Sequence, residues 1–83
     1  MTPGIYKHYK GGRYQALMVA QLSEDRGCLV VVYRSLSTGD TWVRPLRHDG
    51  RVDAWEDKVR WPDGEVRQRF ELETPQGGDS DDT

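Results

Sequence analysis

The chain has 83 residues, of which 35% are hydrophobic and 31% charged, and its 12 basic and 14 acidic residues give a formal net charge of −2. This length suffices for one small domain and excludes a multidomain enzyme with a cleft between lobes. No apolar run approaches the roughly 18 residues of a membrane-spanning helix, and the single cysteine, Cys28, excludes an internal disulfide and multi-cysteine zinc sites.

The first 22 residues predict a β-hairpin. Residues 5–10 form the first predicted strand, with Tyr6 and His8 on the same face. The pair Gly11-Gly12 tolerates the positive φ angles of a tight turn, and residues 14–22 return as the second strand.

The next two predicted strands differ in character. Residues 28–33 are apolar on both faces, which predicts a central strand that is either covered on both sides or rolled into a closed sheet. Residues 42–46 form a short strand, in which Pro45 lacks an N–H and therefore belongs at an edge, a bulge or the strand's end.

The second half of the chain predicts another hairpin, with strands 58–61 and 65–72 around a turn at residues 62–64. In the second arm we expect Val66, Phe70 and Leu72 to face the core and Arg69 to face water. Only residues 53–58 have helical character, in a segment too short to be stable unless it is packed.

These elements predict a mostly β fold. We expect a small SH3-like antiparallel barrel, or a strongly bent sheet, of five to six strands. The alternative is an open antiparallel sheet with one short helix. Residues 1–74 form the predicted domain, whose core should include Trp55 and Trp61. Residues 75–83 are polar and acidic, and we expect them to form a disordered tail.

Three segments carry a resemblance to a known family: residues 3–14, 29–34 and 42–46. They resemble short bacterial proteins that carry a domain of unknown function, number 1653, whose pattern runs G-x-Y-x-H-x-K-G-x-x-Y, then V-V-Y, then W-x-R-P. A looser match follows at Asp63-Gly64 and Arg69-Phe70. The resemblance implies a single small β-rich domain in a bacterium, and it transfers no catalytic residue.

The candidate ligand-binding residues are Tyr6, His8, Tyr33, Trp42 and Arg44. Trp42 and Arg44 point to the same face of a strand, where an indole and a planar guanidinium can hold a planar or anionic group. Each residue also has an ordinary structural interpretation: Trp42 could plug the core, Arg44 could pair with an acid, and Tyr6 and His8 could pack in the interior.

We therefore expect a non-catalytic binding module for a peptide, an RNA or a small anionic ligand, with no cofactor, no metal and no membrane partner. The alternatives are a small hydrolase or transferase that uses His8, and an oligomeric structural protein. The sequence begins without a basic segment followed by an apolar one, so we expect a cytoplasmic protein. We expect a monomer or a weak homo-oligomer.

Overall fold

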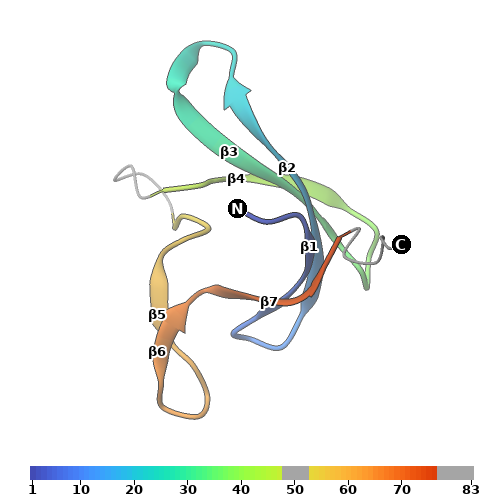
Figure 1. Ribbon diagram of the computed structural model, residues 1–83, viewed down its shortest axis with the longest axis vertical. Helices are drawn as coiled ribbons and strands as arrows, with labels where there is room; N and C mark the ends of the chain where they lie inside the picture. The colour runs from blue at the N-terminus through green and yellow to red at the C-terminus, as the bar shows by residue number, and fades with distance from the viewer. Residues whose placement is uncertain (48–52, 77–83) are drawn as a thin grey trace, which may run out of the picture.

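The computed structural model describes residues 1–47 and 53–76, and these residues form seven β-strands and no helix (Figure 1). The mostly β prediction is confirmed. The strands are β1 (Gly4–His8), β2 (Arg13–Leu22), β3 (Asp25–Ser35), β4 (Thr41–Pro45), β5 (Lys58–Arg60), β6 (Val66–Gln68) and β7 (Phe70–Pro75).

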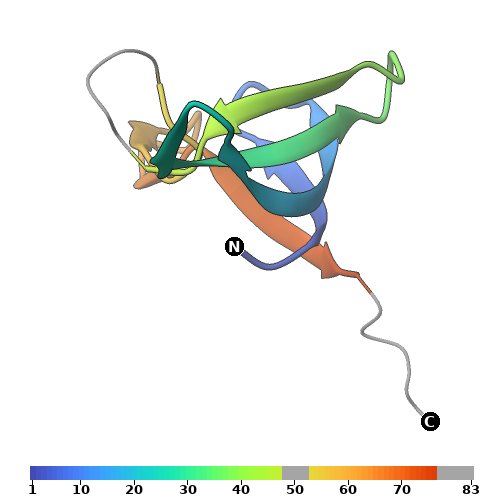
Figure 2. The same cartoon turned by 90° about the horizontal axis from the view of Figure 1, so that it is seen from above.

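Five of these strands form an antiparallel sheet in the order β4-β3-β2-β1-β7, while β5 and β6 pair as a separate hairpin. The large sheet is rolled. In Figure 2, β7 runs at an angle to β3 and β4 and is drawn lower on the page. The guanidinium carbon of Arg44 on β4 lies 5.7 Å from the ring centroid of Phe70 on β7. The order leaves β4 and β7 as edges, so the described strands form a bent sheet without a closed barrel.

The predicted turns and strand ends are present. His8 N donates to Gly12 O at 2.8 Å across the first hairpin, where Gly11 has a φ of +106°. Pro45 is the last residue of an edge strand, where no N–H is needed. β3 lies inside the sheet with Val30 and Val31 both buried, as expected for a strand covered on both sides.

The predicted strand 65–72 is divided at Arg69, which raises the count to seven. Residues before Arg69 pair with β5, whereas residues after it pair with β1. Arg69 N donates to Asp57 O at 2.8 Å and Arg69 O accepts from Tyr9 N at 3.1 Å, so this backbone joins both sheets. The expected burial is wrong at three positions: Arg69 is buried, whereas Val66 and Leu72 are exposed. Alternation does not continue through the bend at Arg69.

Residues 53–57 form a turn in place of the short helix of the alternative prediction. Asp57 N donates to Ala54 O at 3.2 Å, and the Asp57 carboxylate accepts from Ala54 N at 2.8 Å. Trp55 N donates to Pro45 O at 2.8 Å, which fixes the turn against the end of β4. This arrangement carries the Trp55 side chain onto the concave face of the sheet.

Aromatic side chains fill that concave face. The Trp55 ring stacks on Phe70 with centroids 3.8 Å apart and meets Tyr6 and Tyr33 edge to face at 5.1 and 5.2 Å. Edge-to-face and stacked rings are both favourable geometries. The predictions that Trp55, Trp61 and Phe70 belong to the interior are confirmed.

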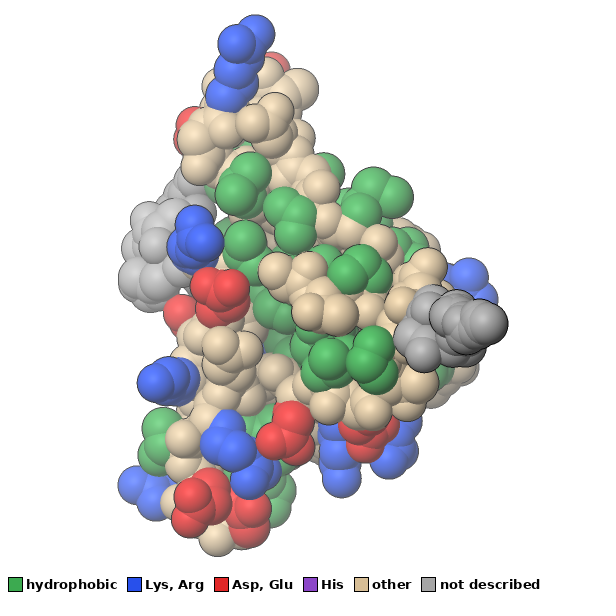
Figure 3. Space-filling model, viewed as in Figure 1, with side chains coloured by type: hydrophobic (Ala, Val, Ile, Leu, Met, Phe, Trp, Pro, Cys, Tyr) green, Lys and Arg blue, Asp and Glu red, His purple; other side chains and the backbone are tan. Residues whose placement is uncertain are grey.

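The outer surface combines apolar and charged regions. Hydrophobic side chains gather across the middle of the face in Figure 3, and charged side chains surround the end that carries β5 and β6. At the end of the described chain, Gln76 N donates to Pro3 O at 2.9 Å. The predicted tail falls for the most part on residues 77–83, outside the described residues.

Candidate functional site

Strand register places the candidate residues on the concave face of the large sheet. Tyr33 on β3 pairs with Trp42 on β4, and Val31 pairs with Arg44. Paired residues of an antiparallel sheet share a face, so Trp42 and Arg44 lie on the side that carries the buried Val31 and Tyr33. This result agrees with the expectation that Trp42 and Arg44 face the same way.

A cavity of about 260 Å³ opens beside these residues, and we call it the Trp42 pocket. Its lining consists of Tyr14, Tyr33, Ser35, Ser37, Thr38, Trp42 and Arg44. The Trp42 side chain is 53% exposed, whereas Trp55 and Trp61 are buried. The pocket therefore presents an open indole surface beside polar groups from neighbouring strands.

Arg44 is held in position by two neighbours. Its Nη1 donates to the backbone oxygen of Asp53 at 2.9 Å, and its Nε donates to the Tyr33 hydroxyl at 3.4 Å. Neither partner is a carboxylate, so the contacts fix the guanidinium without neutralising it. Within the described residues, Arg44 can still offer charge and N–H groups to an anion.

Hydroxyl groups from the β3–β4 connection form another wall of the pocket. The Oγ atoms of Ser35 and Ser37 lie 3.1 Å apart, and Ser35 Oγ accepts from Thr38 N at 3.3 Å. Gly39, with a φ of +81°, donates its N–H to Ser35 O at 2.9 Å and closes the turn. The turn thus holds hydroxyls that can donate to or accept from a polar ligand.

His8 lies behind the pocket, in contact with one of its walls. Its ring centroid is 6.0 Å from that of Tyr14 and 4.8 Å from that of Phe70. Nδ1 accepts a hydrogen bond from Lys10 N at 3.2 Å, which assigns the proton of the neutral ring to Nε2. Burial lowers the pKa of His8 to about 4, with smaller contributions from the positive charges of Arg69, Arg44 and Lys10. The imidazole is therefore neutral at pH 7.

Tyr6 lies deeper than the other candidates and does not line the pocket. Its hydroxyl donates to Thr2 O at 2.6 Å, and its ring packs against Trp55. Burial raises the pKa of the Tyr6 phenol, although the backbone hydrogen bond opposes this shift. The structure thus brings together Tyr33, Trp42 and Arg44, places His8 behind them, and puts Tyr6 in the core.

Arg69 is a residue near the site that the sequence patterns assigned to solvent. The residue is only 8% exposed, and its Nη2 lies 3.1 Å from Asp53 Oδ2. Its guanidinium carbon lies 5.3 Å from the Tyr9 ring centroid, and its buried Nε has no hydrogen-bond partner in the described part of the chain. Asp53 thus contacts Arg69 through its carboxylate and Arg44 through its backbone oxygen.

Other pocket residues also escaped the sequence patterns, namely Tyr14, Ser35, Ser37 and Thr38. A signal was available for Ser35, which lies two residues after Tyr33 and so shares its face. Tyr14 ends the first family-like segment. The two remaining residues lie in a turn, whose side-chain directions do not follow from alternation.

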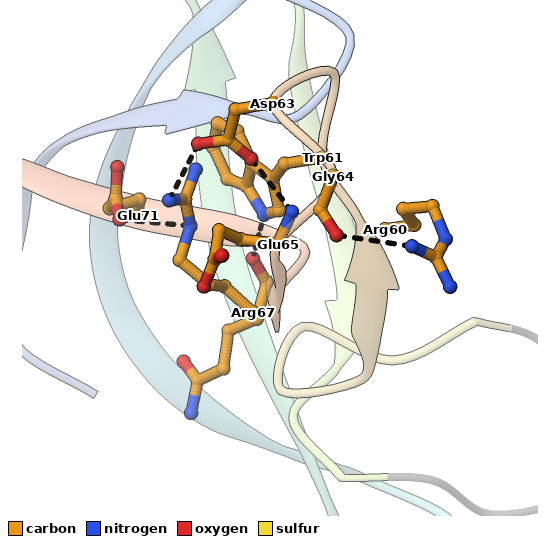
Figure 4. A network of polar contacts seen from close by, with 8 residues as sticks. Arg60, Trp61, Asp63, Gly64, Glu65, Arg67 and Glu71 are labelled. Atoms are coloured by element: carbon orange, nitrogen blue, oxygen red, sulfur yellow. Dashed lines mark hydrogen bonds and ion pairs between the residues drawn. The ribbon is translucent and has the colours of Figure 1, made fainter.

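A second polar cluster joins the small hairpin to the large sheet (Figure 4). Arg67 covers the Trp61 ring at 4.5 Å and contacts Asp63 Oδ2 at 3.1 Å and Glu71 Oε2 at 3.4 Å. Trp61 Nε1 donates to Gln68 O at 2.9 Å. The buried Arg67 Nε has no hydrogen-bond partner among the described residues, and its contact with Glu71 is an ion pair. The cluster thus joins the β5–β6 hairpin to β7.

The described residues contain neither a cluster of metal-ligating side chains nor a membrane-spanning helix. Residues 1–47 and 53–76 contain no group of three or more His, Cys, Asp or Glu side chains arranged to hold a metal ion. No helix long and apolar enough to cross a membrane occurs in the same residues.

The comparisons with known proteins agree with this small β-rich domain. The family model described as "Protein of unknown function (DUF1653)" matches residues 4–72, so the chain belongs to the DUF1653 family. The crystal structure of a DUF1653 protein from Bordetella bronchiseptica is similar, with 33% sequence identity and a TM-score of 0.69. The similarity covers 92% of this chain and 95% of the Bordetella chain. No curated protein matches this chain.

Proposed function

We propose that the chain is a non-catalytic binding module that holds, in the Trp42 pocket, a ligand with a planar group and an anionic group. The observation that carries the proposal is the exposed Trp42 indole beside the Arg44 guanidinium on one strand face of one cavity. An indole supplies stacking area, and a fixed guanidinium supplies charge-assisted hydrogen bonds.

The remaining candidate residues support this pair. The Tyr33 hydroxyl accepts from Arg44 Nε, so Tyr33 both lines the pocket and positions the charge. His8 packs against Tyr14 and supports the pocket from behind, while Tyr6 supports Trp55. An SH3-like character of the bent sheet, a cytoplasmic location and a monomeric or weakly oligomeric state remain parts of the proposal.

The contacts of His8 do not favour the enzyme alternative. Its ring meets the Tyr9, Tyr14 and Phe70 rings, and its Nδ1 already accepts the Lys10 N–H. A general base with a pKa near 4 is a weak proton acceptor at neutral pH. His8 is therefore better suited to packing than to proton transfer.

Tryptophan fluorescence tests the proposal directly. Trp42 is the exposed tryptophan, so acrylamide quenching reports on the pocket while the buried Trp55 and Trp61 respond little. We expect some members of a panel of aromatic carboxylates, nucleotides and anionic peptides to protect Trp42 from the quencher. If no member binds, the proposed function is wrong.

Matched variants locate the binding. Trp42→Leu and Arg44→Gln should each weaken binding by about tenfold or more, the effect of one stacking or charge-assisted contact. Titration calorimetry measures this loss, because Trp42→Leu removes the fluorescent reporter. Val43→Ala is the control, because Val43 is 62% exposed and points to the opposite face. Circular dichroism should show all three variants folded. Unchanged binding in both pocket variants would place the ligand elsewhere.

A further inference from the structure

The edge strand β4 has a free side. β3 pairs with one side of β4, and no strand of the described residues pairs with the other. Ser35 N donates to Asp40 O at 2.9 Å, and bonded positions recur at every second residue of an antiparallel pair. The even-numbered residues of β4 are therefore bonded to β3. The backbone N–H and C=O groups of Thr41 and Val43 point away from the sheet.

The free side of β4 is apolar and short. Trp42 is 53% exposed and Val43 is 62% exposed. Pro45 has no N–H, and its oxygen already accepts from Trp55 N at 2.8 Å. No hydrogen bond among the described residues reaches the outward groups of Thr41 and Val43. An added strand therefore finds its free backbone groups at these two residues.

A second copy of β4 matches these groups in one antiparallel register, with Trp42 opposite the partner's Trp42. Thr41 then lies opposite the partner's Val43, and each residue donates its N–H to the other's oxygen. A register centred on Val43 instead sets Thr41 opposite the partner's Pro45, which has no N–H to donate. A register centred on Thr41 sets Val43 opposite the partner's Gly39, whose N–H is already bonded within its own turn.

The Trp42-centred register is also complementary in charge. Asp40 pairs with Ser35, so its side chain belongs to the concave face that also carries Trp42 and Arg44. With the two Trp42 residues opposed, Asp40 lies opposite the partner's Arg44. Directly opposed side chains have Cβ atoms about 4.5–5.5 Å apart, within reach of an ion pair. The exposed Asp40 carboxylate has no ion pair among the described residues, so it is available to this arginine.

The other edge of the large sheet, β7, is less suited to a second copy. Its exposed Glu71 and Glu73 already form ion pairs with Arg67 and Arg13. Charged side chains on an edge strand are a common protection against pairing with another chain. β4 instead presents exposed hydrophobic side chains.

We infer that two copies of this chain form a dimer by antiparallel pairing of their β4 edges, with the twofold axis at Trp42. The pairing joins the two large sheets into one, and it closes at two copies because each copy contributes its single β4 edge. A contact of one strand pair is small, so the association is weak and depends on concentration. The inference does not require the proposed ligand.

The dimer leaves the residues of the Trp42 pocket in place. The pocket lining comes from β2, β3, β4 and the β3–β4 connection, and the partner approaches β4 from its other side. The partner's Asp40 and an anionic ligand would both contact Arg44. Such a ligand should therefore weaken the dimer.

Sedimentation velocity at protein concentrations from about 10 µM to about 1 mM measures the dimer without any ligand. We expect a dimer fraction that rises with concentration, and no larger species. A protein that stays monomeric up to about 1 mM would overturn the inference.

Val43→Pro tests the edge. The Val43 N–H points away from β3, so proline at this position removes no hydrogen bond within the monomer but removes the bond to the partner's Thr41. We expect a monomer up to about 1 mM, whereas Val43→Ala, which keeps the N–H, should still dimerise. Circular dichroism checks that both variants are folded. If the folded proline variant dimerises as well as the wild type, the contact lies on another surface and the inference is wrong.

Charge variants test the register, and they keep the inference testable if the proline variant unfolds. Asp40→Lys opposes two bases in a homodimer and Arg44→Glu opposes two acids, so each should weaken its own dimer by about tenfold or more. An equimolar mixture of the two variants should dimerise about as well as the wild type, because each lysine then faces a glutamate and Asp40 faces Arg44. A mixture that associates no better than either variant alone would contradict the Trp42-centred pairing. None of these results depends on ligand binding, so the proposed function is tested separately.

Discussion

Lowering the pH from 7 to 4.5 should destabilise this protein through His8. The pKa of its buried imidazole is about 4, against an ordinary value of 6.5 for an unfolded chain. Between these two values the unfolded state binds a proton that the folded state does not. Stability therefore decreases as the pH falls through this range, and the His8 contribution is fully present above pH 6.5.

The size of the effect follows from the shift. At about 1.4 kcal/mol per pKa unit, the shift sets a ceiling of about 3 kcal/mol. Solvent screening reduces our expectation to about 2 kcal/mol at pH 4.5. The positive charges of Arg69, Arg44 and Lys10 add to the effect of burial in lowering the pKa of His8. Asp63 and Glu73, whose pKa values are lowered by hydrogen bonds to Glu65 N and to Arg13 respectively, contribute losses mainly below it.

Urea denaturation at pH 7, 6, 5 and 4.5 measures this dependence. The control is His8→Asn, whose side-chain oxygen can accept the Lys10 N–H but does not titrate. The variant should be less stable at every pH, because it loses ring contacts, and it should show a weaker dependence on pH. Equal slopes in the two proteins, or a His8 imidazole that titrates near 6.5 by NMR, would refute the reasoning.

Two further predictions concern the interior and the β1–β7 pairing. Phe70→Ala should lower the free energy of unfolding by about 3–5 kcal/mol, because Phe70 is only 2% exposed and its ring stacks on Trp55. Chemical denaturation measures this loss. A variant as stable as the wild type would contradict the packing. Gly4→Ala should destabilise the protein more than Gly11→Ala. A Cβ at Gly4 would collide with Thr74 O, whereas a Cβ at Gly11 meets open space, and both residues have positive φ; equal melting temperatures of the two variants would rule out the collision.

The sequence predicted those parts of the fold in which side chains alternate regularly between the two faces of a strand. Tyr6 and His8 share the buried face of β1, as a period of two requires, and the glycine-containing turns lie where they were expected. Alternation failed at Arg69, because one residue with backbone bonds to two sheets reverses the faces around it. The alternation of side chains along a segment does not show which sheet the strand will join.

The candidate site shows a similar division. Alternation predicted that Trp42 and Arg44 share a face, but exposure depends on how far the Trp55 turn extends over that face. Trp55 covers Tyr33 and Phe70, and Trp42 remains 53% exposed. The placement of the 53–57 turn depends on its hydrogen bond to Pro45 O, a tertiary contact that the sequence does not reveal.

The pairing of β1 with β7 has a consequence for how the protein is made. Gly4 pairs with Pro75 and His8 with Phe70, so the first strand of the chain needs the last described one to complete the sheet. During synthesis, β1 can form its hairpin with β2 early, but its other edge stays unpaired until residue 75 has left the ribosome. Pairing between such distant segments also slows folding, because a long loop must close before the contacts form. A nascent chain that stalls before residue 70 would therefore expose the β1 edge, together with a concave face that lacks Phe70, to chaperones and to other unfinished chains.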